Sequence, residues 1–227
     1  FVSIDLQQIL MSKYYRLSTI VLTLELIHSF LLHMQMVVRV LFKTILPVKY
    51  HGLEHVSDLK APYILMANHT TMLDPFMMAV AIPQYQIRFI GKKELWKFPP
   101  FAWFANQIKA IPVDRHNTDM EAMRACMRVT REGHVLGIFP EGTRHHKGLM
   151  TELESGVAMI ALRSKVPLVP VYIAGKLGFF RTLHVYVGKP IMMDDLRAEG
   201  INTQTCQALL GRITETYAAL DAARPEA

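Results

Sequence analysis

Short apolar runs alternate with helix-like patterns along most of this chain, and this alternation leaves few folds open to it. Each run is bounded by proline, glycine or polar residues, which is typical of a buried strand. The expected strands lie at about residues 63–67, 87–91, 110–113, 135–139, 167–173 and 184–187. The expected helices lie near residues 75–82, 118–132, 155–164 and 203–220. This order predicts an α/β fold in which a mixed sheet is flanked by helices.

The segment from Asn68 to Asp74 places an imidazole and a carboxylate five residues apart at the end of an expected strand. Asp74 and Pro75 open the following helix pattern, where they predict an N-cap and the first helical residue. The loop is short enough for Asp74 to accept a hydrogen bond from one imidazole nitrogen of His69, which leaves the other nitrogen to take a proton. The pair predicts a general base with its orienting group. The alternative is a helix cap beside an ordinary loop histidine.

No nucleophile of the protein's own accompanies this pair. The sequence has no Gly-x-Ser-x-Gly elbow. Its two cysteines, Cys126 and Cys206, fall within distant helical patterns and predict buried thiols. We therefore expect the substrate to bring the nucleophile, as a hydroxyl that His69 deprotonates and that then attacks an acyl carbon.

A second motif follows the apolar run at residues 135–139. It reads Pro140-Glu-Gly-Thr-Arg144, a turn that contains a glycine and a forked cation. Gly142 would let backbone N–H groups approach an anion closely, and the guanidinium of Arg144 can pair two phosphate oxygens. A plain surface turn is the alternative. Both motifs fall at the carboxyl ends of expected strands, where open α/β sheets place their ligand sites.

Four sequence blocks, taken in order, make the chain resemble the glycerolipid acyltransferase family typified by 1-acylglycerol-3-phosphate acyltransferase. The resemblance covers roughly residues 47 to 190. The blocks are Asn68-His69 through Asp74, Gly91-Lys-Lys-Glu-Leu95 leading to Ile111-Pro-Val-Asp-Arg115, Phe139-Pro-Glu-Gly-Thr-Arg144, and Val166-Pro-Leu-Val-Pro-Val171.

The resemblance implies a role for each matching residue. His69 would be the general base and Asp74 its partner. Lys92 would help to stabilise the tetrahedral oxyanion, with Lys93 as the alternative. The residues implied to hold the acceptor's phosphate are Glu141, Gly142, Thr143 and Arg144. Arg115 would contribute to the same site, although pairing with a nearby acid is an equal alternative.

The resemblance also implies a reaction. A fatty acyl group would pass from a thioester of acyl-CoA or acyl carrier protein to the free hydroxyl of lysophosphatidic acid, giving phosphatidic acid, with no metal or other cofactor. The segment Glu152-Leu-Glu-Ser-Gly156 departs from the family, which is commonly basic there. Another lysolipid acceptor therefore stays open, although acidic residues also suit the first turn of a helix.

The amino-terminal residues are unusually apolar. From Leu17 to Leu46 they contain no glycine or proline and are interrupted by few charges, among them Glu25, Arg39 and Lys43. A charge at the bilayer centre is costly, so residues 1–46 predict a monotopic anchor rather than a spanning helix. A helical hairpin packed on the enzyme's core is the alternative. Residues 47–227 would form the catalytic domain. Met11 resembles a natural amino-terminal residue.

The charge balance points to the same surroundings. The net charge is +6 and the basic residues are spread out rather than gathered around aromatic platforms. This favours an anionic membrane surface over nucleic acid as a partner. We expect the protein at the cytoplasmic face of the cell membrane, as a monotopic or peripheral protein.

Two other functions compete with acyl transfer. A phosphoesterase could use the same histidine, aspartate and arginine, but most would need metal ligands or a covalent nucleophile. A non-catalytic module could bind lipid phosphate alone. The segment Pro99-Pro-Phe-Ala-Trp-Phe104 has three open interpretations, which are a wall for an acyl chain, a second membrane contact, and a buried turn.

Overall fold

The computed structural model divides the chain into two compact units, residues 1–40 and 41–227. The described residues are 13, 18, 21–23, 25–26, 29, 33–34, 36–37, 39–113, 120–142, 149–150, 153–175, 178–179 and 181–224. Phe42 and Leu46, which the sequence analysis placed in the apolar amino-terminal segment, belong to the second unit and are buried. The first unit therefore ends at Val40, and the expected boundary lay at residue 46.

The described residues of the first unit, which begin at Lys13 and end at Val40, are helical. None of the helices that the described residues form reaches the length and apolarity needed to cross a bilayer. Much of the expected anchor over residues 1–46 lies outside the described residues.

A single seven-stranded sheet organises the second unit. Its strands are β1 (Val48–His51), β2 (Ile64–Ala67), β3 (Ile87–Lys92), β4 (Ile111–Val113), β5 (Val135–Ile138), β6 (Leu168–Ala174) and β7 (Leu183–Val187). They lie in the order β1-β7-β6-β2-β5-β3-β4. The five strands from β6 to β4 are parallel, and β7 pairs with β6 in the antiparallel sense. The sheet is therefore mixed, as the sequence predicts.

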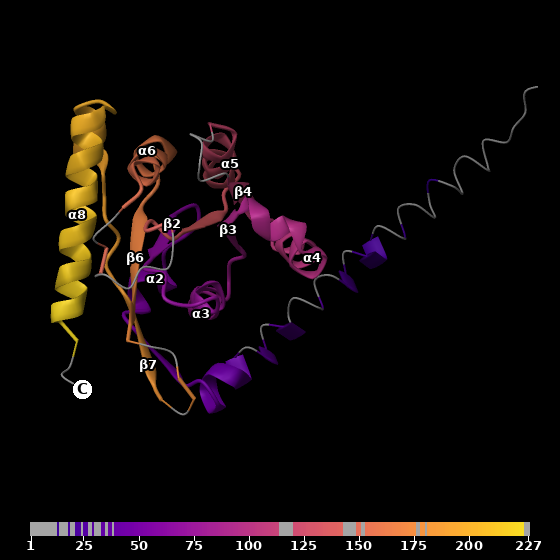
Figure 1. Ribbon diagram of the computed structural model, residues 1–227. Helices are drawn as coiled ribbons and strands as arrows, with labels where there is room; N and C mark the ends of the chain where they lie inside the picture. Colours follow the sequence, from indigo (N-terminus) through magenta and orange to yellow (C-terminus); the bar gives the residue numbers. More distant parts are fainter. Residues whose placement is uncertain are drawn as a thin grey trace, which may run out of the picture. The chain divides into compact units, whose positions relative to one another are not determined.

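Helices cover both faces of the sheet. They are α2 (Glu54–Ser57), α3 (Asp74–Ala81), α4 (Pro99–Gln107), α5 (Met120–Arg131), α6 (Ser155–Ser164), α7 (Asp194–Ala198) and α8 (Thr203–Ala222), with a 3-10 turn η1 at Lys93–Lys97. Figure 1 shows α5, α6 and α8 as one layer and α3 on the other side of the strands. Every residue of β2, β5 and β6 is buried, which explains why these strands appear as continuous apolar runs.

The apolar runs predict six of the seven strands of this sheet but not β1. Val48–His51 is only half-buried at the edge of the sheet and has little apolar signal. The sequence pattern does not predict α4 either, because Pro99 and Pro100 are typical of a turn. Both prolines instead occupy the first turn of the helix, where a missing N–H costs no hydrogen bond. The short α2, η1 and α7 gave no periodic pattern.

Candidate active site

His69 and Asp74 form a hydrogen-bonded pair at the carboxyl end of β2. Nδ1 of His69 lies 2.8 Å from Oδ2 of Asp74. A carboxylate only accepts, so the imidazole proton resides on Nδ1 and the lone pair of Nε2 is left for a substrate. The imidazole retains 16% of its exposure and Asp74 has none. The expected pairing is present, and its geometry is that of a base and its orienting group.

The loop between the two residues wraps around the carboxylate of Asp74. The backbone N–H groups of Thr70 and Thr71 donate to Oδ2 at 2.5 and 2.9 Å. Their hydroxyls donate to Oδ1 at 3.1 and 2.8 Å. The sequence alone assigns no role to either threonine, although hydroxyls placed just before an aspartate are a recognisable signal for such bonds.

The expectation that Asp74 caps the helix was wrong. The helix α3 begins at Asp74, Leu73 occupies the cap position, and no side chain makes a cap hydrogen bond there. The reason is physical. All of the hydrogen bonds of the carboxylate go back to the preceding loop and to His69, so none is left for the N–H groups of the following turn.

Glu141 links the two motifs through hydrogen bonds. Its Oε2 accepts the backbone N–H of His69 at 2.9 Å, and its Oε1 accepts the backbone N–H of Met150 at 3.1 Å. The side chain is only 5% exposed. A buried carboxylate that is already hydrogen-bonded to two amides is poorly suited to receive a phosphate anion. In this structure Glu141 holds the backbone of the histidine loop against the turn that follows β5.

Two further residues position the imidazole. Phe139 stacks on His69 with ring centroids 4.3 Å apart. Asn68, which is buried, donates from Nδ2 to the carbonyl of Ile173 at 3.0 Å and accepts the Ile173 N–H at Oδ1 at 2.7 Å. The two bonds fix the end of β2 to β6. Both residues belong to the sequence blocks, but the sequence pattern alone does not predict this role.

Lys92 ends β3 and is exposed. Its Nζ lies 4.0 Å from Oε2 of Glu94, while Lys93 opens the η1 turn. Since β3 neighbours β5 and β5 neighbours β2, all in the parallel sense, Lys92, Glu141 and His69 follow strand ends on one edge of the sheet. The structure therefore brings these three positions to a common edge.

Gly142 adopts a left-handed backbone conformation, with φ of +65°. A Cβ at this position would lie 2.8 Å from Oε1 of Glu154, so the site has little room for a side chain. The Gly142 N–H donates to the carbonyl of Phe139 at 3.2 Å and closes the turn. That N–H is used internally, which differs from the expected contact with an anion.

Three of the expected substrate-binding residues, Arg115, Thr143 and Arg144, lie outside the described residues. Within the described parts of the chain, no group of three or more histidine, cysteine, aspartate or glutamate side chains could hold a metal ion.

The fold and this site define an α/β protein that holds a histidine against a buried carboxylate at the carboxyl edge of parallel strands. A family model described as "Acyltransferase" matches residues 47–174, and the chain belongs to this family. The resemblance drawn from the four sequence blocks is thereby confirmed.

The chain is similar to proteins named 1-acyl-sn-glycerol-3-phosphate acyltransferase. It is 30% identical to one from Streptococcus pneumoniae over 178 residues, which cover 76% of this chain and 65% of that protein. It is 34% identical to one from Bacillus subtilis over 108 residues, which cover 48% and 53%. The chain thus spans less than two thirds of the first of these relatives and about half of the second.

A solved structure supports the fold. The crystal structure of PlsC, the 1-acyl-sn-glycerophosphate (LPA) acyltransferase from Thermotoga maritima, superposes with a TM-score of 0.61 at 23% identity. The match covers 79% of this chain and 74% of that one.

Proposed function

We propose that this protein transfers a fatty acyl group from a thioester to the free hydroxyl of lysophosphatidic acid, giving phosphatidic acid. The observation that carries the proposal is the hydrogen bond of 2.8 Å between Nδ1 of His69 and the buried Asp74, which leaves Nε2 available on an imidazole that is still partly exposed. The choice of substrate rests on the names of the similar proteins.

The proposed reaction needs no nucleophile from the protein. Nε2 of His69 removes the proton from the acceptor hydroxyl, and the resulting oxygen attacks the thioester carbonyl carbon. Asp74 stabilises the imidazolium that forms. The tetrahedral intermediate then collapses, the carbon–sulfur bond breaks, and the leaving sulfur takes the proton from His69. An ester and a free thiol are the products.

Charged and backbone groups at the same edge would stabilise this intermediate. We assign the oxyanion to Lys92, with Lys93 as the alternative and backbone N–H groups as additional donors. Loss of one oxyanion donor typically costs about 3 kcal/mol of barrier. For the acceptor's phosphate we assign Thr143, Arg144 and Arg115, because arginine pairs two phosphate oxygens at once.

The donor is either acyl-CoA or acyl carrier protein. Both are anionic and suit a chain with a net charge of +6. Within the family a different lysolipid acceptor is the nearest alternative. We propose that no metal takes part.

We further propose that residues 1–46 attach the protein to the cytoplasmic face of the membrane as a monotopic anchor. Large apolar side chains of the first unit are more than half exposed, which supports this proposal. They are Val21, Leu22, Leu26, Met36, Val37 and Val40.

The test is thiol release from oleoyl-CoA in detergent with EDTA, with and without lysophosphatidic acid. We expect release that depends on the acceptor and disappears in His69→Ala. His134→Ala is the matched control, since His134 directly precedes β5 at the opposite edge of the sheet and should leave the rate unchanged.

Each other outcome points to a different function. Release of inorganic phosphate from lysophosphatidic acid that EDTA abolishes, without thiol release, would favour a metal-dependent phosphoesterase. If no thiol is released with acyl-CoA or acyl carrier protein as donor, or with other lysolipids as acceptor, a lipid-binding module would be the better explanation.

A further inference from the structure

The segment formed by η1 and α4 exposes large apolar side chains beside the active site. Phe98 is 64% exposed and Trp103 is 52% exposed. Lys97, Pro99 and Pro100 are exposed as well. We call these five residues, together with Lys93, the η1–α4 surface.

The outward face of α4 differs from that of an ordinary surface helix. A helix at a protein–water boundary normally carries charged residues on its exposed side. The helix α4 reads PPFAWFANQ and contains no charged residue. Its exposed positions are Pro99, Pro100, Trp103 and Asn106. Of these, only Asn106 carries a polar amide, and it lies in the last turn.

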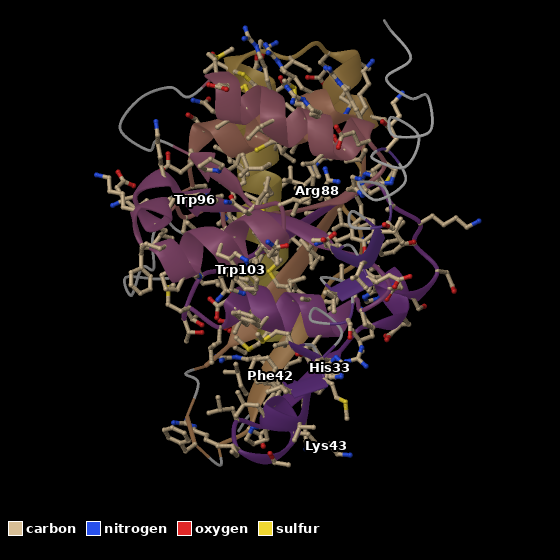
Figure 2. All side chains as sticks on the ribbon, turned by 90° about the vertical axis from the view of Figure 1, so that its right-hand side faces the viewer. His33, Phe42, Lys43, Arg88, Trp96 and Trp103 are labelled. Atoms are coloured by element: carbon tan, nitrogen blue, oxygen red, sulfur yellow. The ribbon has the colours of Figure 1, made fainter. Side chains whose placement is uncertain are left out.

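Ring packing and a hydrogen bond hold this segment in place. Ala105 is fully buried, and Phe104 stacks on Phe76 of α3 with ring centroids 5.7 Å apart. The indole N–H of Trp96 donates to Oδ1 of Asn106 at 3.0 Å, and Figure 2 labels both Trp96 and Trp103 on this segment. The exposed rings of Phe98 and Trp103 therefore belong to a segment that is itself packed against α3.

Three lysines precede the exposed rings in the sequence. Lys92, Lys93 and Lys97 lie within one short segment that contains the single acid Glu94. Aromatic side chains together with lysines are typical of segments that lie at the headgroup level of a bilayer, because the rings enter the interface and an anionic leaflet attracts the lysines.

The surface adjoins the catalytic pair. Phe76, which α4 contacts through Phe104, lies two residues after Asp74 on α3. Met72, in the loop between His69 and Asp74, is also about half exposed. An acceptor held in a bilayer would thus lie close to the base.

We propose that the η1–α4 surface seats on an anionic phospholipid bilayer, with Phe98 and Trp103 entering its interfacial layer. The proposal rests on the proposed function in one respect, because a lipid acceptor is what makes a membrane the natural occupant beside His69. Two other occupants of this surface are an acidic carrier protein and a second copy of the chain. The experiment below distinguishes both of them from a bilayer.

The chain offers an internal reporter. It has two tryptophans, so Trp96→Phe leaves Trp103 as the only one. We expect the Trp103 emission of the full chain to shift to the blue on mixed phosphatidylcholine and phosphatidylglycerol vesicles, and acyl-chain-brominated lipid to quench it. Vesicle-bound protein with unchanged Trp103 emission would overturn the proposal, as would failure to bind. A shift produced by acyl carrier protein or by concentrating the protein, without vesicles, would also overturn it.

Substitutions locate the contact. Phe98→Ser should lower the vesicle partition coefficient about tenfold, given the transfer free energy of a phenylalanine side chain. The matched control is Phe179→Ser, which removes a phenylalanine that is 76% exposed in the β6–β7 connection and should change nothing. Lys97→Gln should weaken binding to anionic vesicles but not to pure phosphatidylcholine. Equal losses in the two serine variants would contradict the assignment.

The same variants separate this proposal from the proposed function. Acyl transfer to a short-chain, soluble acceptor should be unchanged in Phe98→Ser. Insertion of Trp103 without any acyl transfer would support the membrane contact of the η1–α4 surface and refute the proposed reaction. Acyl transfer without insertion would support the reaction and refute the membrane contact.

Discussion

The two oxygens of Asp74 have different kinds of partners. Oδ2 accepts from the imidazole and from two backbone N–H groups, and these backbone groups can only donate. Oδ1 accepts from the hydroxyls of Thr70 and Thr71, which can rotate and accept instead. An asparagine amide therefore fits this site in one orientation, with its NH₂ group toward the threonines.

This asymmetry makes Asp74→Asn a selective change. We expect kcat to fall by about 10²–10⁴-fold, because the negative charge that stabilises a protonated His69 is gone. The loop should survive, so the melting temperature should change by no more than about 4 °C. Steady-state kinetics and a thermal melt on the same preparation test both parts. A large loss of melting temperature that accounts for the loss of activity would mark Asp74 as mainly structural.

For a substitution at Glu141 we expect a loss of stability together with the loss of turnover. In Glu141→Gln the amide NH₂ must face the backbone N–H of either His69 or Met150, and neither can accept. A buried unsatisfied donor costs about 1–3 kcal/mol. We expect urea unfolding to show a loss of this size, accompanied by reduced turnover because the His69 loop shifts.

Glu154→Gln is the control for that experiment. Glu154 lies over Gly142 but is exposed, so the same chemical change should alter the free energy of unfolding by less than about 0.5 kcal/mol. If Glu141→Gln proved as stable as the parent, Glu141 could not be the link between the two motifs.

At the level of elements, an ion pair joins α7 to α8. Nη2 of Arg212 lies 2.5 Å from Oδ2 of Asp195, and Nη1 also donates to the carbonyl of Met192 at 2.9 Å. The hydrogen bond from Arg212 lowers the pKa of Asp195 to about 2. Both side chains are partly in solvent, so the contribution to stability is small.

The direction in which pH changes the contribution of the Asp195–Arg212 pair to stability is nevertheless definite. A carboxyl whose pKa is lower in the folded state stabilises the fold above its unfolded pKa of about 4 and loses this contribution as the pH falls toward about 2. Asp195→Asn should therefore melt slightly below the parent at neutral pH, and the gap should close between about pH 4 and pH 2. A gap that widened with acid would exclude the pairing as its cause.

At the scale of the whole second unit, the strand order gathers the site. His69 follows β2, Glu141 and Gly142 follow β5, and Lys92 ends β3. These three strands are adjacent and parallel, so their carboxyl ends meet at one edge. Ligand sites of α/β sheets occur at such edges.

Local sequence was sufficient for several features of this protein. Buried strands appear as apolar runs because both of their faces are covered, which is why β2, β5 and β6 were located. The His69–Asp74 pair was also accessible, since a hydrogen bond across five residues depends mainly on a short loop.

Long-range contacts were decided only by the folded chain. Nothing in the sequence specifies that β2 lies between β5 and β6, or that Glu141 accepts the N–H of a residue 72 positions away. The hydrogen bonds of Asn68 to Ile173 span 105 positions. The same contacts changed the interpretation of Glu141 from a phosphate ligand to a support for the loop. A side chain's type states what it can bond to, but its partner depends on which strands become neighbours, and that is settled by packing of the whole core.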